Sequence, residues 1–63
     1  MITEIVLDII NGSDKHYDLS FFNKELLSNS ELRIDTQYDM ATKYHIGTGD
    51  AYEIIDLLCG LDN

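Results

Sequence analysis

The run SELRIDTQYDM, from Ser30 to Met40, constrains the fold of this chain more than any other stretch. Every second residue from Leu32 to Met40 is apolar or uncharged, and the residues between them are charged or carry an amide. A period of two is typical of a half-buried β-strand, with one face toward the core and the other toward water. The run therefore predicts the strand around which the rest of the chain is arranged.

The first twenty residues favour a β-hairpin. Thr3 to Ile10 is rich in β-branched residues, which suit a strand, and Asn11-Gly12 is a strong hairpin signal. Lys15 to Phe21 then returns as the second strand. A three-residue loop, Asn11-Gly12-Ser13, is the better register because it turns the apolar residues of both strands inward.

That register has a consequence for the outer face of the hairpin. The face carries four carboxylates, those of Glu4, Asp8, Asp14 and Asp18, and no Lys or Arg. Like charges at this spacing cost stability, so they point either to a solvated acidic face or to a binding surface.

The remaining segments are shorter. Residues 20–28 change to a helical period, and Tyr44 and Ile46 suggest a fourth short strand before Gly47-Thr48-Gly49. Asp50 to Cys59 favours a helix that Asp50 caps and Gly60 ends, although a strand from Tyr52 to Leu58 is the rival interpretation.

These segments predict an α+β fold. We expect one domain, residues 1–63, with an antiparallel sheet of three or four strands and one or two short helices on one face. The predicted core consists of Ile5, Leu7, Ile9, Tyr17, Leu19, Phe22, Leu26, Leu32, Ile34, Tyr38, Ile54, Ile55 and Leu58.

The composition limits the partners and the cellular compartment that can be expected for this chain. A 63-residue chain has a marginal core, so dimerisation or a larger partner would be an ordinary source of stability. The net charge of −8 repels nucleic acid and anionic membranes and favours basic partners. One cysteine, no apolar run of membrane length and no signal peptide predict a protein of the reducing cytoplasm.

Catalytic and metal-binding patterns are absent from the sequence. His16, His45 and Cys59 stand far apart, with no spacing typical of zinc ligands. The loop Gly47-Thr48-Gly49-Asp50 lacks the third glycine of a phosphate-binding fingerprint and places a carboxylate where phosphate would bind. We therefore expect neither an enzyme nor a cofactor or metal site.

Part of the chain resembles a family of inhibitors. The elements Ser30-Glu31-Leu32, Thr36-x-Tyr38-Asp39-x-x-Thr42 and Thr48-x-Asp50-Ala51-x-Glu53 are similar to the middle of the phage uracil-DNA glycosylase inhibitors of the Ugi type. The resemblance covers about a third of the chain with gaps, and the Pro-Glu-Glu run of that family is absent. It implies a strand-turn-strand order and a small acidic protein that mimics DNA.

Charge and resemblance together predict a non-enzymatic inhibitor of phage or mobile-element origin. It would bind the nucleic-acid site of a basic host protein, such as uracil-DNA glycosylase or a CRISPR–Cas effector, and would not bind nucleic acid itself. The alternative is an acidic interaction module, such as a dimeric accessory subunit or an antitoxin-like neutraliser. The predicted binding residues are Glu4, Asp8, Asp14, Asp18, Glu31, Asp35, Asp39 and Tyr44.

Overall fold

Helices form all the regular structure in the computed structural model, which describes residues 1–61. No strand is present among these residues, so the prediction of an α+β fold with an antiparallel sheet is wrong. The elements are α1 (Ile2–Asn11), the 3₁₀ turn η1 (Leu19–Phe21), α2 (Lys24–Ser28), α3 (Ser30–Tyr44) and α4 (Thr48–Gly60).

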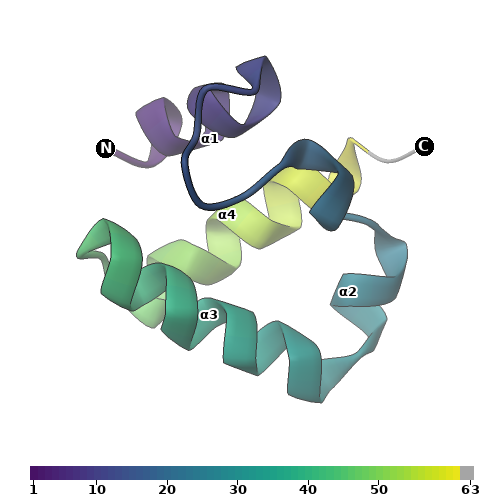
Figure 1. Ribbon diagram of the computed structural model, residues 1–63. Coiled ribbons are helices and arrows are strands. Elements are labelled where there is room, and N and C mark those ends of the chain that lie inside the picture. The colour runs from purple at the N-terminus through teal and green to yellow at the C-terminus, as the bar shows by residue number, and fades with distance from the viewer. Residues whose placement is uncertain (62–63) are drawn as a thin grey trace.

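Helix α4 is the centre of the fold. It packs against α1, α2 and α3, and Figure 1 shows it passing between α1 above and α3 below. Its buried residues, Ala51, Ile54, Ile55, Leu58 and Cys59, follow the three- and four-residue spacing of one helix face. The prediction of a helix here is confirmed. Its ends differ, however: Gly47 is the N-cap, and Gly60 is the last helical residue rather than the cap.

The predicted first strand is helix α1. Ile2, Ile5 and Ile9 lie on one face of the helix and pack on the core, while Leu7, which the hairpin register placed inside, is half exposed. Burial of this face outweighs the preference of β-branched residues for strands, because that preference is weak and depends on context.

Asn11-Gly12 ends α1 instead of turning a hairpin. Gly12 has a φ of 78°, in the left-handed region that glycine adopts without strain. Its N–H donates to the carbonyl of Ile9 at 3.2 Å, and the N–H of Ser13 donates to the carbonyl of Asp8 at 2.9 Å. This pair of bonds is the Schellman motif of a helix C-terminus, so residues 15–21 have no strand to pair with.

The alternating run is the first two-thirds of α3. The helix buries Thr36 and Met40, which are four residues apart, and leaves Ile34 and Tyr38 on the opposite, exposed side. A period of two places residues on both sides of a helix, so alternation alone cannot say which of them are buried. The Thr36 hydroxyl donates to the Leu32 carbonyl at 2.8 Å, which satisfies the buried polar group.

Asparagine residues cap the starts of α2 and α3, and a residue in the left-handed conformation follows the end of α3. Asn23 caps α2 and Asn29 caps α3, each through its side-chain oxygen. α3 ends at His45, whose φ of 57° is left-handed, so the predicted fourth strand at 44–46 is wrong. The helix expected over 20–28 is confirmed only for Lys24–Ser28, because Phe22 and Asn23 are extended.

About half of the predicted core is buried. Ile5, Ile9, Phe22, Leu26 and the three α4 residues of the prediction are buried, and Tyr17 and Leu19 are partly so. Leu7, Leu32, Ile34 and Tyr38 are exposed, because each was placed inside by a period of two. No helix among residues 1–61 has the length and apolar character needed to cross a membrane.

Candidate partner-binding surface

The predicted binding residues lie on three separate parts of the fold. The single acidic hairpin face that the sequence suggested does not exist, because residues 3–10 are helical and residues 13–18 form a loop. Glu4 and Asp8 lie on α1, Asp14 and Asp18 on the following loop, and Glu31, Asp35, Asp39 and Tyr44 on α3.

Three of these residues meet in a tyrosine–aspartate cluster, formed by Asp14, Tyr17, Asp39 and Tyr44. The Tyr44 hydroxyl on α3 donates to Asp14 Oδ2 on the loop at 2.7 Å. In the opposite direction, the Tyr17 hydroxyl on the loop donates to Asp39 Oδ2 on α3. The two hydrogen bonds together fasten the loop to α3.

Asp14 is further held by the loop backbone. Its Oδ2 accepts the N–H groups of His16 at 2.9 Å and Tyr17 at 2.8 Å. Partial burial alone would raise the pKa of Asp14, but these bonds, the Tyr44 hydroxyl and the nearby His16 stabilise the charged form. The net effect is a pKa below the usual 3.8.

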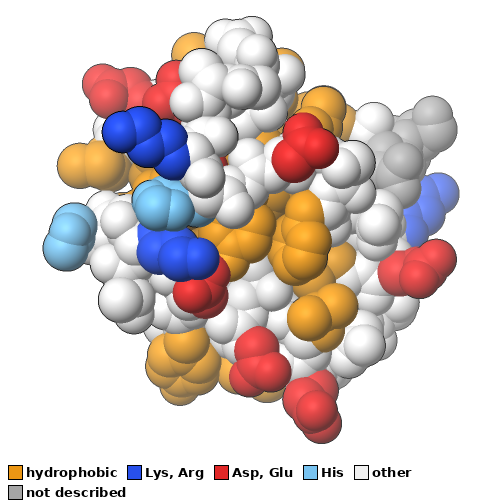
Figure 2. Space-filling view, viewed as in Figure 1, with side chains coloured by type: hydrophobic (Ala, Val, Ile, Leu, Met, Phe, Trp, Pro, Cys, Tyr) orange, Lys and Arg blue, Asp and Glu red, His pale blue; other side chains and the backbone are white. Residues whose placement is uncertain are grey.

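Basic side chains surround the same cluster. Lys43 Nζ lies 3.0 Å from Asp39 Oδ2 and 5.4 Å from the centre of the Tyr17 ring, and the His16 ring packs edge-on against Tyr44. The Tyr17 hydroxyl and then Lys43 lower the pKa of Asp39. Figure 2 shows lysine or arginine and histidine side chains gathered beside an exposed hydrophobic area of this face.

The cluster is therefore better suited to holding the loop than to binding a basic partner. The carboxylates of Asp14 and Asp39 already accept hydrogen bonds, and Lys43 offsets the charge of Asp39. Tyr44, one of the predicted binding residues, is partly buried, and its hydroxyl is engaged by Asp14.

A shallow pocket of about 290 Å³ lies beside the cluster. Asp8, Asp14, His16 and Tyr44 are among the residues that line it. Among residues 1–61, however, no three His, Cys, Asp or Glu side chains are grouped closely enough to hold a metal ion. Ser13 and Lys15 also line the pocket, and the Ser13 hydroxyl donates to Asp8 Oδ1 at 3.3 Å.

Further acidic residues lie on α1 and α4, and one of them, Asp8, lines the same pocket as Lys15 and His16. Neither helix contains Lys, Arg or His, and all five of their carboxylates are exposed. The five are Glu4, Asp8, Asp50, Glu53 and Asp56. On α3, Arg33 lies between Glu31 and Asp35 in sequence, and its guanidinium lies 5.1 Å from the centre of the ring of Tyr52 on α4.

Exposed apolar side chains accompany these carboxylates. On α1, Leu7 is 50% exposed and Ile10 is 39% exposed; on α4, Leu57 is 55% exposed and Leu61, which follows its last residue, is 58% exposed. Sequence reasoning missed the α4 residues. Their signal is the four-residue spacing of Glu53, Leu57 and Leu61, which places them on one face once the segment is taken as a helix.

Comparison of the chain with protein-family models, curated proteins and solved structures found no significant match. The strand-turn-strand order implied by the resemblance to the Ugi type is absent from residues 30–53, which form α3 and the start of α4. A functional argument for this chain therefore depends on its own surface.

Proposed function

We propose that this protein is a non-enzymatic inhibitor that covers the basic, nucleic-acid-binding surface of another protein. The observation that carries the proposal is the set of five exposed carboxylates on α1 and α4, two helices that pack together and contain no Lys, Arg or His. On these helices, carboxylates three or four residues apart are neighbours, about 5–6 Å between Cβ atoms. Such a surface attracts the lysines and arginines that otherwise contact phosphates.

The setting we propose is the cytoplasm of a host cell. The net charge of −8 would speed association with a basic target, and the single cysteine is buried and compatible with a reducing compartment. Uracil-DNA glycosylase and CRISPR–Cas effectors are the first targets to test, because each must present a basic surface to DNA.

The test begins with capture of partners from bacterial lysate on the tagged protein, followed by elution in steps of salt. A captured nucleic-acid-binding protein should release duplex DNA when this protein binds it. Its affinity should fall steeply between about 50 mM and about 200 mM salt, because each neutralised charge adds to the salt dependence. Binding that does not change over this range, or that leaves DNA in place, would contradict the proposal.

Charge-neutral variants sharpen the test. Glu4→Gln with Asp8→Asn should weaken binding of the captured partner and flatten its salt dependence. Glu31→Gln with Asp35→Asn removes the same charge from α3 and is the matched control, for which we expect a smaller effect. Equal losses in both pairs would mean that only the net charge matters and that α1 is not in the interface.

The exposed leucines on α1 and α4 support a second candidate, an acidic interaction module with an apolar interface. Such a module would serve as an accessory subunit or an antitoxin-like neutraliser. In that case, binding would persist at high salt and would tolerate the charge-neutral variants, while Leu7→Ala would weaken it.

A further inference from the structure

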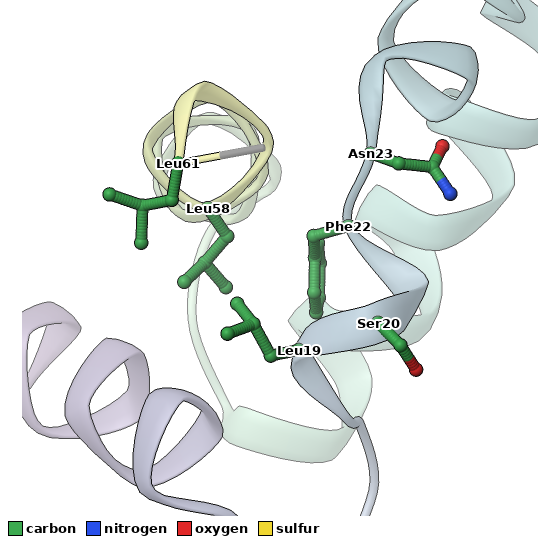
Figure 3. A pocket seen from close by; sticks show the side chains of 6 residues that line it. All are labelled: Leu19, Ser20, Phe22, Asn23, Leu58 and Leu61. Carbon is green, nitrogen blue, oxygen red and sulfur yellow. The ribbon is translucent and has the colours of Figure 1, made fainter. Parts of the chain in front are cut away.

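A hollow between η1 and the C-terminal end of α4 offers a place for an apolar side chain. Its volume is about 310 Å³, at the low end for ligand pockets, so it suits part of a partner better than a large ligand. Figure 3 shows Leu58 of α4 directed toward Leu19, with Phe22 beside them and Leu61, just after α4, turned to the other side. Ser20 and Asn23 complete the lining.

The residues that line the hollow favour the entry of an apolar group. Phe22 and Leu58 are buried at 2% and 0% exposure, while Leu61 is exposed, so an incoming side chain would remove apolar surface of Leu61 from water. Two polar side-chain atoms of the lining are already engaged. Ser20 Oγ donates to Asp18, and Asn23 Oδ1 accepts the N–H of Leu26 at 3.1 Å.

A stripe of exposed residues leads along α4 to this hollow. Asp50, Glu53, Leu57 and Leu61 follow one another at intervals of three or four residues, so they share one face over about 16 Å of helix. The stripe is acidic in its first half and apolar in its second. Leu61 belongs to both the stripe and the hollow.

We propose that this α4 surface, the stripe with the hollow at its end, binds a basic amphipathic helix of the partner protein. An apolar side chain of that helix fills the hollow, and lysines or arginines on the same segment face Asp50 and Glu53. The inference rests on the proposed function and names its contact surface. The basic residue nearest in sequence to the hollow is Lys24 on α2, which an incoming helix would have to avoid.

Charge argues against a second copy of this chain as the occupant. A copy seated on α4 would bring another net charge of −8 toward Asp50 and Glu53, and like charges across an interface are costly. The same argument disfavours an anionic membrane surface. A basic segment gains both the apolar contact and the electrostatic attraction.

The test uses isotope-labelled protein and a synthetic helical peptide that carries leucines on one face with lysines beside them. Saturable shifts of the amide signals of Leu19, Leu57 and Leu61 are expected. Replacing the peptide leucines by alanine, or its lysines by glutamate, should weaken binding at least about tenfold. Absence of saturable binding, or shifts centred on Ile34 and Tyr38 of α3, would overturn the proposal.

Protein variants complete the experiment. Asp50→Lys with Glu53→Lys should weaken peptide binding at least about tenfold, whereas Glu31→Lys with Asp35→Lys makes the same charge change on α3 and should weaken it about threefold or less. Leu61→Ala should also weaken binding, and the control Leu32→Ala on α3 should not. Both leucines are exposed, so both proteins should keep their helical circular dichroism.

Three further outcomes test the occupant of the surface and separate this proposal from the function on which it rests. Concentration-dependent shifts at Leu57 and Leu61 without peptide would show that a second copy occupies the surface, and would overturn the proposal. If Asp50→Lys with Glu53→Lys leaves DNA displacement from the captured partner intact, the α4 surface is wrong and the inhibitor function stands. Peptide binding on α4 with no displacement of DNA would contradict the inhibitor function but not the α4 binding surface.

Discussion

Tyr17 and Tyr44 exchange hydrogen bonds between the loop and α3 in opposite directions. Each hydroxyl donates to an aspartate of the other segment, and Lys43 and His16 pack against the two rings. Partial burial and then the neighbouring carboxylate raise the pKa of each tyrosine. Hydrogen bonds to a charged acceptor contribute more than neutral ones, so this exchange is a local source of stability.

We expect Tyr44→Phe to lower the free energy of unfolding by about 1–2 kcal/mol, because it removes a bond to a carboxylate while keeping the ring. Urea unfolding followed by circular dichroism measures the change. Tyr38→Phe is the matched control, since Tyr38 is 64% exposed on the same helix, and it should change stability by less than about 0.5 kcal/mol. Equal effects of the two variants would contradict this role of the cluster.

At the residue scale, the sequence predicted that Asp14, Asp39 and Tyr44 bind a partner, whereas the structure shows their side chains in hydrogen bonds within the fold. The sequence pattern assigned Tyr17 to the core and the two aspartates to an outer face. The partner of each carboxylate is 22 or 30 residues away in the chain, and no periodicity within a segment reports such a contact. These hydrogen bonds depend on how the loop packs against α3, and the sequence pattern carries no information about that packing.

At the scale of elements, the sequence predicted a helix correctly where apolar residues recur at intervals of three and four. The buried face of α4 is the clearest case. Strands were predicted where β-branched residues or alternation dominated, and both signals are compatible with a helix that has a buried side. Ile5 and Ile9 were nonetheless placed in the core, because residues four apart share a face in either structure.

Substitution by alanine should have opposite effects on stability at Gly12 and Gly49, although both positions have room for a Cβ. A Cβ at Gly12 or at Gly49 would meet nothing within 4 Å. Gly12 has a φ of 78° at the end of α1, so Gly12→Ala should cost about 1 kcal/mol. Gly49 lies inside α4, where alanine should stabilise by about 0.5–1 kcal/mol.

Thermal unfolding of the two glycine variants would check the opposite signs. For a domain of this size, a change of 1 kcal/mol shifts the midpoint by about 4–8 °C, which is easily resolved. A lower midpoint for Gly49→Ala, or an unchanged one for Gly12→Ala, would contradict the assigned ends of α1 and α4.

At the scale of the whole molecule, the tyrosine–aspartate cluster sets a pH window of stability. The lowered pKa values of Asp14 and Asp39 stabilise the fold above the usual 3.8, and this contribution is lost as pH falls further. The raised pKa values of Tyr17 and Tyr44 stabilise it below their usual 10.0. Above that pH the unfolded chain ionises first, and the contribution is lost.

The measurement is the difference in unfolding free energy between the natural protein and Tyr44→Phe across pH. Taking this difference cancels most of the repulsion among the twelve acidic residues, which both proteins share. It should be constant between about pH 5 and pH 9, and should shrink below about pH 4 and above about pH 10. A difference that persists unchanged to about pH 3 would contradict the part assigned to Asp14.

The central position of α4 has a consequence for synthesis of the chain. Helices α1, α2 and α3 each bury their apolar faces against a helix that follows them in the sequence. Until the ribosome has released Thr48–Gly60, α1 lacks its main packing partner, and α2 and α3 have mainly each other. Translation of thirteen residues takes on the order of a second, so the nascent chain is exposed to chaperones and proteases until α4 emerges.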